Sequence, residues 1–265
     1  MKYFFNEYLE YKKSEVQKLK GDFTLRELQQ SISLLGLGEK RGLERALQLA
    51  GFGVLGELQK VSPLTGKSRE NFQPARIALK YKDAGVCGIS ISTDAEFFQW
   101  DKSYINLVKP LLQLPIVRNE LIIDEFQLYE SRAIGADAVI LVSTCLDPVQ
   151  LKDYLQLGFE LGLECLVEIQ NEKELEQALK AEAQILGVNN RVLINFQTEL
   201  ETSYRLIREI PENVYAVSEY GIGTPGEVSR LQKAGFDGIL IGDESLPEKN
   251  PEKKLKELIE QSFIR

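Results

Sequence analysis

Histidine is absent from this chain of 265 residues. The absence removes the commonest general base, a common metal ligand and a catalytic-triad member at once. A hydrolase with a serine–histidine–aspartate triad is therefore excluded, and a zinc enzyme nearly so. Acid–base chemistry in this chain must depend on carboxylates, lysine or tyrosine.

Cysteine is scarce, and long apolar segments are missing. The three cysteines, Cys87, Cys145 and Cys165, lie in apolar stretches without the spacing of metal ligands, which favours reduced thiols in a core. No apolar run is long enough to span a bilayer, and residues 1–5 pass at once into charges rather than into a signal peptide. We expect a cytoplasmic protein that does not contact a membrane.

Basic residues are in the minority. The formal net charge is −8, which argues against a surface for nucleic acid or anionic lipid. The hydrophobic fraction of 43% is ordinary for a soluble globular chain. The length suits one large domain or two small ones.

The first 50 residues have the pattern of helices. Residues 6–19 are amphipathic, and Thr24 with Glu27 has the spacing of a capping box at the start of a second helix. We expect residues 31–37 to be looser and residues 39–49 to return to helix. Since no strand precedes Val54, residues 1–50 are expected to form a helical extension over the mouth of the following domain.

A repeated unit follows, in which an apolar run ends in polar residues and a helical segment and a glycine lead into the next run. The glycine junctions at 83–90, 133–140 and 233–240 resemble one another, as helix C-cap glycines before buried strands do. The candidate strands are near-continuously apolar, which is typical of parallel strands buried on both faces. They cover residues 54–58, 88–92, 116–118, 138–142, 164–168, 184–187, 214–218 and 238–241.

Eight such strands separated by helices predict a (β/α)8 barrel over residues 51–265. A doubly wound sheet is the main alternative, but no glycine-rich dinucleotide turn follows the first strand. Active sites of such barrels lie at the carboxyl ends of the strands. Glu57, Glu168 and Glu219 at these ends are candidates for acid–base catalysis, because burial and mutual repulsion raise carboxyl pKa values. A loop cap or an ion pair is the alternative at each position.

Three further strand-end segments have two interpretations each. Residues 189–191 are a binding segment or a simple turn, since Asn tolerates a left-handed backbone. Residues 220–225 are a loop capped by Thr224, or an anion site at a helix start. Residues 97–100 are core or, as we favour, the wall of a pocket for an aromatic substrate.

Seven short motifs together resemble the indole-3-glycerol phosphate synthase family over essentially the whole chain. They are Gly56-Glu57-x-x-Lys60-x-Ser62-Pro63, Ser92-Thr93-Asp94-x-x-Phe97-Phe98, Leu121-Ile122-Ile123-Asp124-x-x-Gln127, Gly135-Ala136-Asp137-Ala138, Leu166-Val167-Glu168, Gly187-Val188-Asn189-Asn190-Arg191 and Ser218-Glu219-x-Gly221-Ile222. The resemblance implies a barrel enzyme that decarboxylates, cyclises and dehydrates an anilino-sugar phosphate to an indole. We expect no metal and no organic cofactor.

The resemblance also implies functions for single positions. Glu168 matches the glutamate that acts in proton transfer, Phe98 matches a wall of the aromatic pocket, and Gly221 and Gly242 match backbone donors to the substrate phosphate. The further matched positions and motif residues are Glu57, Lys60, Ser62, Asn189, Arg191 and Glu219.

Four positions depart from the family pattern. Gln59 and Asn119 stand where the resemblance implies lysines that bind the substrate carboxylate and protonate a carbonyl, and neutral amides orient an oxygen but cannot supply a proton. Tyr220 replaces a small residue at the phosphate site, and Trp100 replaces a glycine. The departures favour a larger, more aromatic substrate without phosphate.

Three functions remain as hypotheses. The first is a decarboxylating cyclase for an indole- or phenol-bearing β-keto acid, as in the member of the family that serves scytonemin biosynthesis. Such an acid loses CO2 through its own enol, so carboxylates suffice for the remaining proton transfers. The second is an indole-3-glycerol phosphate synthase of tryptophan biosynthesis with reassigned acids, and the third is a non-catalytic binding barrel. In the first two, the partner is a small aromatic molecule.

Overall fold

The computed structural model describes residues 2–35, 41–61, 72–94, 101–191, 198–242 and 250–262. Eight parallel strands form a closed barrel in sequence order, and β8 pairs with β1 to complete it. The strands are β1 (Gly53–Leu58), β2 (Gly88–Ser92), β3 (Ile116–Asn119), β4 (Ala138–Val142), β5 (Glu164–Ile169), β6 (Ile185–Asn189), β7 (Tyr215–Glu219) and β8 (Gly238–Ile241).

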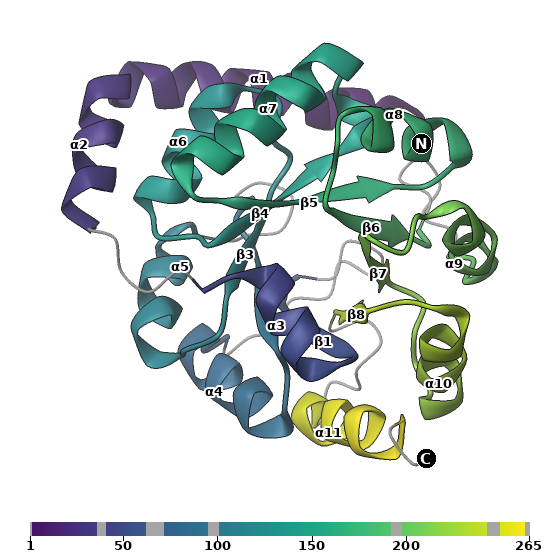
Figure 1. Ribbon diagram of the computed structural model, residues 1–265. Coiled ribbons are helices and arrows are strands. Elements are labelled where there is room, and N and C mark those ends of the chain that lie inside the picture. The colour runs from purple at the N-terminus through teal and green to yellow at the C-terminus, as the bar shows by residue number, and fades with distance from the viewer. Residues whose placement is uncertain are drawn as a thin grey trace.

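Helices follow the strands and surround the barrel (Figure 1). They are α4 (Pro74–Ala84), α5 (Ser103–Val108), α6 (Glu125–Ala133), α7 (Pro148–Leu161), α8 (Glu172–Lys180), α9 (Glu201–Leu206), α10 (Pro225–Ala234) and α11 (Pro251–Ser262), with short 3-10 turns at Lys109–Leu111, Ser143–Cys145 and Ile207–Glu209. The predicted (β/α)8 barrel is confirmed, and the doubly wound alternative was wrong. None of the described helices is long and apolar enough to cross a membrane.

Each strand has two buried faces with different neighbours. Side chains such as Ile89 and Ile91 point outward and pack in the core beneath the surrounding helices. Inward positions, among them Leu55, Val117 and Leu166, form a second buried cluster inside the barrel. Because side chains alternate along a strand, the inward position two residues beyond Leu55 is Glu57, and the one beyond Leu166 is Glu168. The apolar interior therefore gives way to polar groups at the carboxyl ends.

The strands agree closely with the predicted ones, and the differences lie at their ends. The ladder continues far enough to include Glu168, Asn189 and Glu219, through the pairs Glu168↔Gly187 and Asn189↔Glu219. These polar residues were expected at strand ends or just beyond them. They belong to the strands, so their backbones are held by the sheet and not by loops.

Three helices precede the barrel: α1 (Lys2–Asp22), α2 (Leu25–Leu35) and α3 (Leu43–Ala50). The predicted capping box is confirmed, since Thr24 N donates to Glu27 Oε2 at 2.7 Å and Glu27 N donates to Thr24 Oγ1 at 3.2 Å. The looser structure expected over 31–37 was wrong as far as Leu35. Ser31 and Ser33 lie within α2, and their hydroxyls donate to the carbonyls of Glu27 and Gln29, four residues earlier.

The third helix, α3, closes the amino-terminal end of the barrel, so the expectation that the extension lies over the mouth was wrong for this helix. Leu43 and Leu47 are fully buried in the inner cluster that contains Leu55. Glu164 at the start of β5 accepts a hydrogen bond from Glu44 N at 2.9 Å. In Figure 1, α3 lies over the strands in the middle of the view.

The cysteines are free thiols, as predicted. Burial raises the pKa of Cys87, Cys145 and Cys165 to about 12 each. They are therefore protonated and unreactive at neutral pH.

Candidate active site

Five buried polar side chains at the carboxyl ends of the strands form the candidate site. They come from five different strands and point into the barrel, and each has at most a few per cent of its surface exposed except Asn119, which is partly exposed. The residues are Glu57, Asn119, Glu168, Asn189 and Glu219. All five are among the site residues predicted from the sequence.

Glu57 on β1 and Asn119 on β3 meet across β2. Asn119 Nδ2 donates to Glu57 Oε1 at 2.8 Å. The β2 residue in register with Glu57 is Ser90, whose small side chain leaves room between the two strands. Gly242 beyond β8 also makes room, because a Cβ there would lie 2.5 Å from Glu57 Oε2. Asn119 therefore orients the carboxylate of Glu57.

Glu168 on β5 and Glu219 on β7 form a carboxyl pair across β6. Gly187 lies between them, and a Cβ on it would lie 2.1 Å from Glu219 Oε1. Within the described residues, no N–H group and no hydroxyl donates a hydrogen bond to either carboxyl oxygen of Glu219. Its polar neighbour is the carboxyl group of Glu168. Two acceptors at such close quarters are compatible only when a proton lies on one of them.

Burial raises the pKa of both carboxyls. It raises the pKa of Glu168 to about 7, against the opposing effects of the Asn189 amide and the Arg191 guanidinium. The pKa of Glu219 lies well above its ordinary value, through burial and then through the negative charges of Glu168 and Glu57. The pair can therefore hold one shared proton at neutral pH and titrates as a unit.

Arg191 and Tyr220 are stacked beside this pair. The Arg191 guanidinium carbon lies 4.2 Å from the centre of the Tyr220 ring, within the range of a cation–π contact. Tyr220 has φ 63°, a left-handed backbone that is uncommon for a bulky side chain. Burial and the charges of the three glutamates raise the pKa of its phenol well above the ordinary value. The hydroxyl is therefore protonated throughout the physiological pH range.

The segment 189–191 begins with the last residue of β6 and continues with a hydrogen-bonded Asn190, while its binding role stays a prediction. Asn190 Nδ2 donates to the carbonyls of Glu219 at 2.9 Å and Tyr220 at 3.1 Å, and to Ser218 Oγ at 3.1 Å. Its Oδ1 accepts from Ser203 N at 3.1 Å. This one buried amide holds the end of β7, and with it the strained backbone of Tyr220.

The loop before α10 is capped from within the chain. Glu227 Oε2 accepts hydrogen bonds from Gly223 N and Thr224 N at 2.9 Å each. Thr224 Oγ1 accepts from Glu227 N, and Pro225 begins the helix. These donors are therefore not offered to an anion. Gly221, with φ 74°, and Gly242 lie near this loop and β8, at the strand ends where the resemblance expects phosphate donors.

Of the other predicted site residues, two lie just beyond β1 and three lie outside the described part of the chain. Gln59 is buried just beyond β1, and its Oε1 has no hydrogen-bond partner among the described residues. Lys60 is half-buried in the same segment. Ser62, Phe98 and Trp100 lie outside the described residues. In the described part of the chain, no group of three or more acidic, cysteine or histidine side chains is placed to hold a metal ion.

A buried charge cluster that was not predicted from the sequence lies beside the site. Lys12 of α1 is fully buried and pairs with Asp94 at 2.7 Å and with Glu120 at 2.8 Å. Its spacing was a signal, because Lys12, Val16 and Leu19 lie on one face of the helix and all three are buried. A lysine on the apolar face of an amphipathic helix needs a buried partner.

Comparison with known proteins identifies the family. The family model for indole-3-glycerol phosphate synthase matches residues 5–258. The chain belongs to this family. It is an enzyme of the carboxy-lyase and cyclase class to which the family's members belong.

The relatives are similar over most of their length. The indole-3-glycerol phosphate synthase of Chlorobium phaeovibrioides is 40% identical over 89% of this chain and 91% of its own. That of Caldanaerobacter subterraneus is 37% identical over 96% of this chain and 97% of its own. A solved N-acetylmannosamine-6-phosphate 2-epimerase from Clostridium perfringens aligns with a TM-score of 0.59 over 74% of this chain and 89% of its own, at 15% identity. That likeness concerns the fold alone.

Proposed function

We propose that this family member is a decarboxylating cyclase for an indole-bearing β-keto acid without phosphate, the type of reaction used in scytonemin biosynthesis. The observation that carries the proposal is the stack of Tyr220 on Arg191. It occupies a position where the resemblance implies a small residue beside the substrate phosphate. A bulky ring there reduces the space for a phosphate and adds an aromatic surface against which an indole can pack.

The charges of the site support a substrate with a single carboxylate. Arg191 is the cation beside the carboxyl pair, where its charge lowers the pKa of Glu168, and the three glutamates together surround Tyr220. A second anionic group, such as a phosphate, would be repelled by the carboxylates of the described strand ends. The substrate carboxylate is expected to bind Arg191 and to leave as CO2.

The proposed reaction needs no ammonium acid. The bond from the carboxylate carbon to the α-carbon breaks, and its electron pair forms the enolate of the ketone as CO2 leaves. The enolate carbon then attacks a second carbonyl, whose oxygen receives the proton shared by Glu168 and Glu219, and the ketone is regenerated. Water is lost when that hydroxyl leaves with a proton and a carboxylate removes the proton from carbon. Gln59 and Asn119 serve as neutral hydrogen-bond donors.

The second candidate is indole-3-glycerol phosphate synthesis in the tryptophan pathway. The names of the similar proteins favour it, since relatives near 40% identity over most of the chain are named for that activity. It requires the acid role of the absent lysines to be taken over by the carboxyl pair. A non-catalytic barrel is disfavoured. Burying Glu219 beside Glu168 costs free energy when no N–H or hydroxyl group of the described residues donates to Glu219.

The two candidates differ in one assay. We expect the purified protein to release CO2 from the indole-bearing β-keto acid and to leave the anilino-sugar phosphate unchanged. Inorganic phosphate should bind no tighter than about 1 mM, or about −4 kcal/mol. Micromolar binding or turnover of the sugar phosphate would instead support the second candidate.

Two variants of Tyr220 test whether its ring is the cause of weak phosphate binding. Tyr220→Ser removes the ring, so it should tighten phosphate binding, measured by calorimetry, while weakening the binding of the β-keto acid. Tyr220→Phe keeps the ring and the stack on Arg191, and phosphate binding should stay as weak as in the wild type. Equal phosphate affinity in all three proteins would show that Tyr220 does not exclude phosphate.

A further inference from the structure

A lysine from the first helix is buried against the mouth of the barrel. Lys12 has no exposed surface. Its ammonium pairs with Glu15 on its own helix, with Asp94 after β2 and with Glu120 after β3. Burial lowers the pKa of Lys12, but the three carboxylates more than offset that effect, so the net pKa is raised and the group stays charged.

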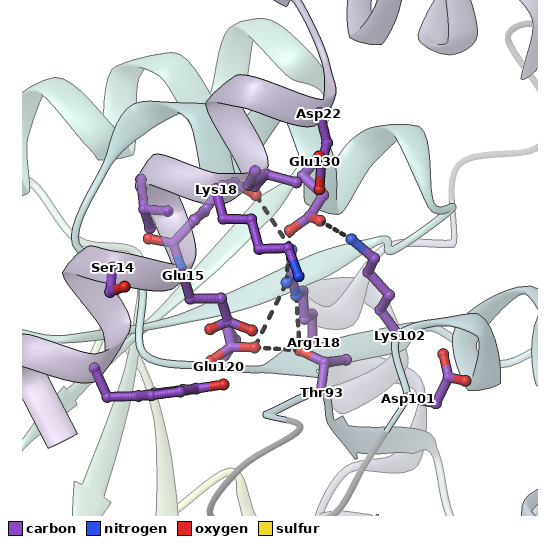
Figure 2. Close-up of a pocket in the computed structure, with 14 residues that line it drawn as sticks. Ser14, Glu15, Lys18, Asp22, Thr93, Asp101, Lys102, Arg118, Glu120 and Glu130 are labelled. Atoms are coloured by element: carbon purple, nitrogen blue, oxygen red, sulfur yellow. Dashed lines mark hydrogen bonds and ion pairs between the residues drawn. The ribbon is translucent and has the colours of Figure 1, made fainter.

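Glu120 connects Lys12 to the end of β3, because it directly follows the last residue of that strand. Besides Lys12, its carboxylate accepts from Thr93 Oγ1 at 2.7 Å and from Leu121 N at 3.0 Å. Figure 2 shows Glu120 and Thr93 with Arg118 beneath α1. The three residues line a cavity of about 580 Å³. Arg118 donates to Thr93 Oγ1 at 2.9 Å and pairs with Glu130 at 2.8 Å. The backbone that carries Glu120 is therefore fixed by several charged contacts.

Asn119 immediately precedes Glu120 and points the opposite way. Its amide donates to Glu57 inside the barrel, while Glu120 faces Lys12 outside the inner ring. A shift of the backbone at Glu120 must therefore move the amide of Asn119. The contact between Lys12 and Glu120 is the link from the first helix to the orientation of Glu57.

Attachment of the helices does not by itself explain the buried charge. Leu19 and Leu28 pack against Phe126 of α6, and Lys20 pairs with Asp124 at 2.7 Å in a more exposed position. Apolar packing could also fill the place of Lys12, and a buried ion pair is often no more stable than such packing. What the ion pairs add is a fixed geometry at two strand ends.

We propose that Lys12 is a positioning residue of the active site, which acts through Glu120 on Asn119 and thereby on Glu57. The proposal holds for either candidate substrate, because it concerns the carboxylate that both reactions would use. The charged and titratable groups around Lys12 are Tyr8, Tyr11, Glu15, Asp94, Arg118 and Glu120.

A double-mutant cycle tests the proposal with whichever substrate the wild type converts. We expect Lys12→Met to lower kcat by roughly 10–100-fold, since small misplacements in an active site cost that much, while KM changes less than threefold or so. In an Asn119→Ala background the same change should lower kcat by less than about threefold, because the group it positions is gone. Lys12→Arg keeps the charge and should restore part of the rate.

The neighbouring residue provides a matched control. Lys13 is exposed and pairs with Glu10 on the surface, so Lys13→Met should leave kcat unchanged. If Lys12→Met does not fold, Glu120→Gln replaces it, since Lys12 then keeps Glu15 and Asp94 as counterions. Full additivity of either variant with Asn119→Ala, or an unchanged kcat in the folded variant, would overturn the proposal and leave Lys12 a structural residue.

Discussion

Glu168 is the residue whose protonation state governs the proposed chemistry. Burial raises its pKa to about 7, so its acid form is populated below that pH and is lost above it. We expect Glu168→Gln, which keeps the shape but has no transferable proton, to slow cyclisation by at least ~10²-fold. The measurement is a single-turnover rate across pH 5–9, with thermal unfolding recorded to check that the fold is kept.

The pH profile contains the control for this prediction. The wild-type rate should fall as pH rises through about 7, and the residual rate of Glu168→Gln should lack that limb. Near wild-type turnover by the variant would assign the acid role to Glu57 or Glu219, or show that the ring closes unaided.

The positions of the three glutamates could be predicted from the sequence, but the small residues that make room for their side chains could not. Glu57, Glu168 and Glu219 follow from one rule, that the carboxyl ends of parallel strands meet at one edge. Gly187 leaves the space that the Glu219 side chain on the next strand occupies. That contact depends on the register between the two strands, which the sequence does not specify. The roles of Ser62, Phe98 and Trp100 stay predictions.

Among the elements, α3 offers the clearest test of packing. Leu47 is fully buried at the amino-terminal end of the barrel, whereas Leu49 on the same helix is 76% exposed. We expect Leu47→Ala to lower the free energy of unfolding by about 2–5 kcal/mol through the cavity that it leaves. Leu49→Ala should change it by less than about 0.5 kcal/mol. Urea unfolding measures both, and equal effects would mean that α3 does not close the barrel.

The strands were easier to predict than the helices in front of them. A parallel strand buried on both faces is marked by its own apolar run, and 88–92, 138–142 and 238–241 agree with β2, β4 and β8 to the residue. The position of α1 and α3 at opposite ends of the barrel depends on contacts with residues far along the chain, such as Glu120 and Glu164. Local periodicity does not contain that information.

For the molecule as a whole, the acidic site should reduce stability as pH rises. A carboxyl whose pKa is raised on folding binds its proton more tightly in the folded state, so stability is lost as pH rises above its unfolded pKa. Because the pKa of Glu219 is raised by burial and by two neighbouring carboxylates, we expect Glu219→Gln to raise Tm at pH 8. The gain should be about 2–4 °C per kcal/mol and should shrink towards pH 5. A Tm that is lower than that of the wild type at pH 8 would contradict this.

The pairing of the first strand with the last sets the order in which the chain can be completed during synthesis. Gly53 of β1 lies in register with Gly238 of β8, so the ring of strands stays open until nearly the whole chain has left the ribosome. Until then the apolar face of α3 has only part of its eventual covering. A nascent or prematurely terminated chain therefore exposes an unpaired sheet edge together with the apolar face of α3. Chaperones bind such surfaces, and aggregates form through them.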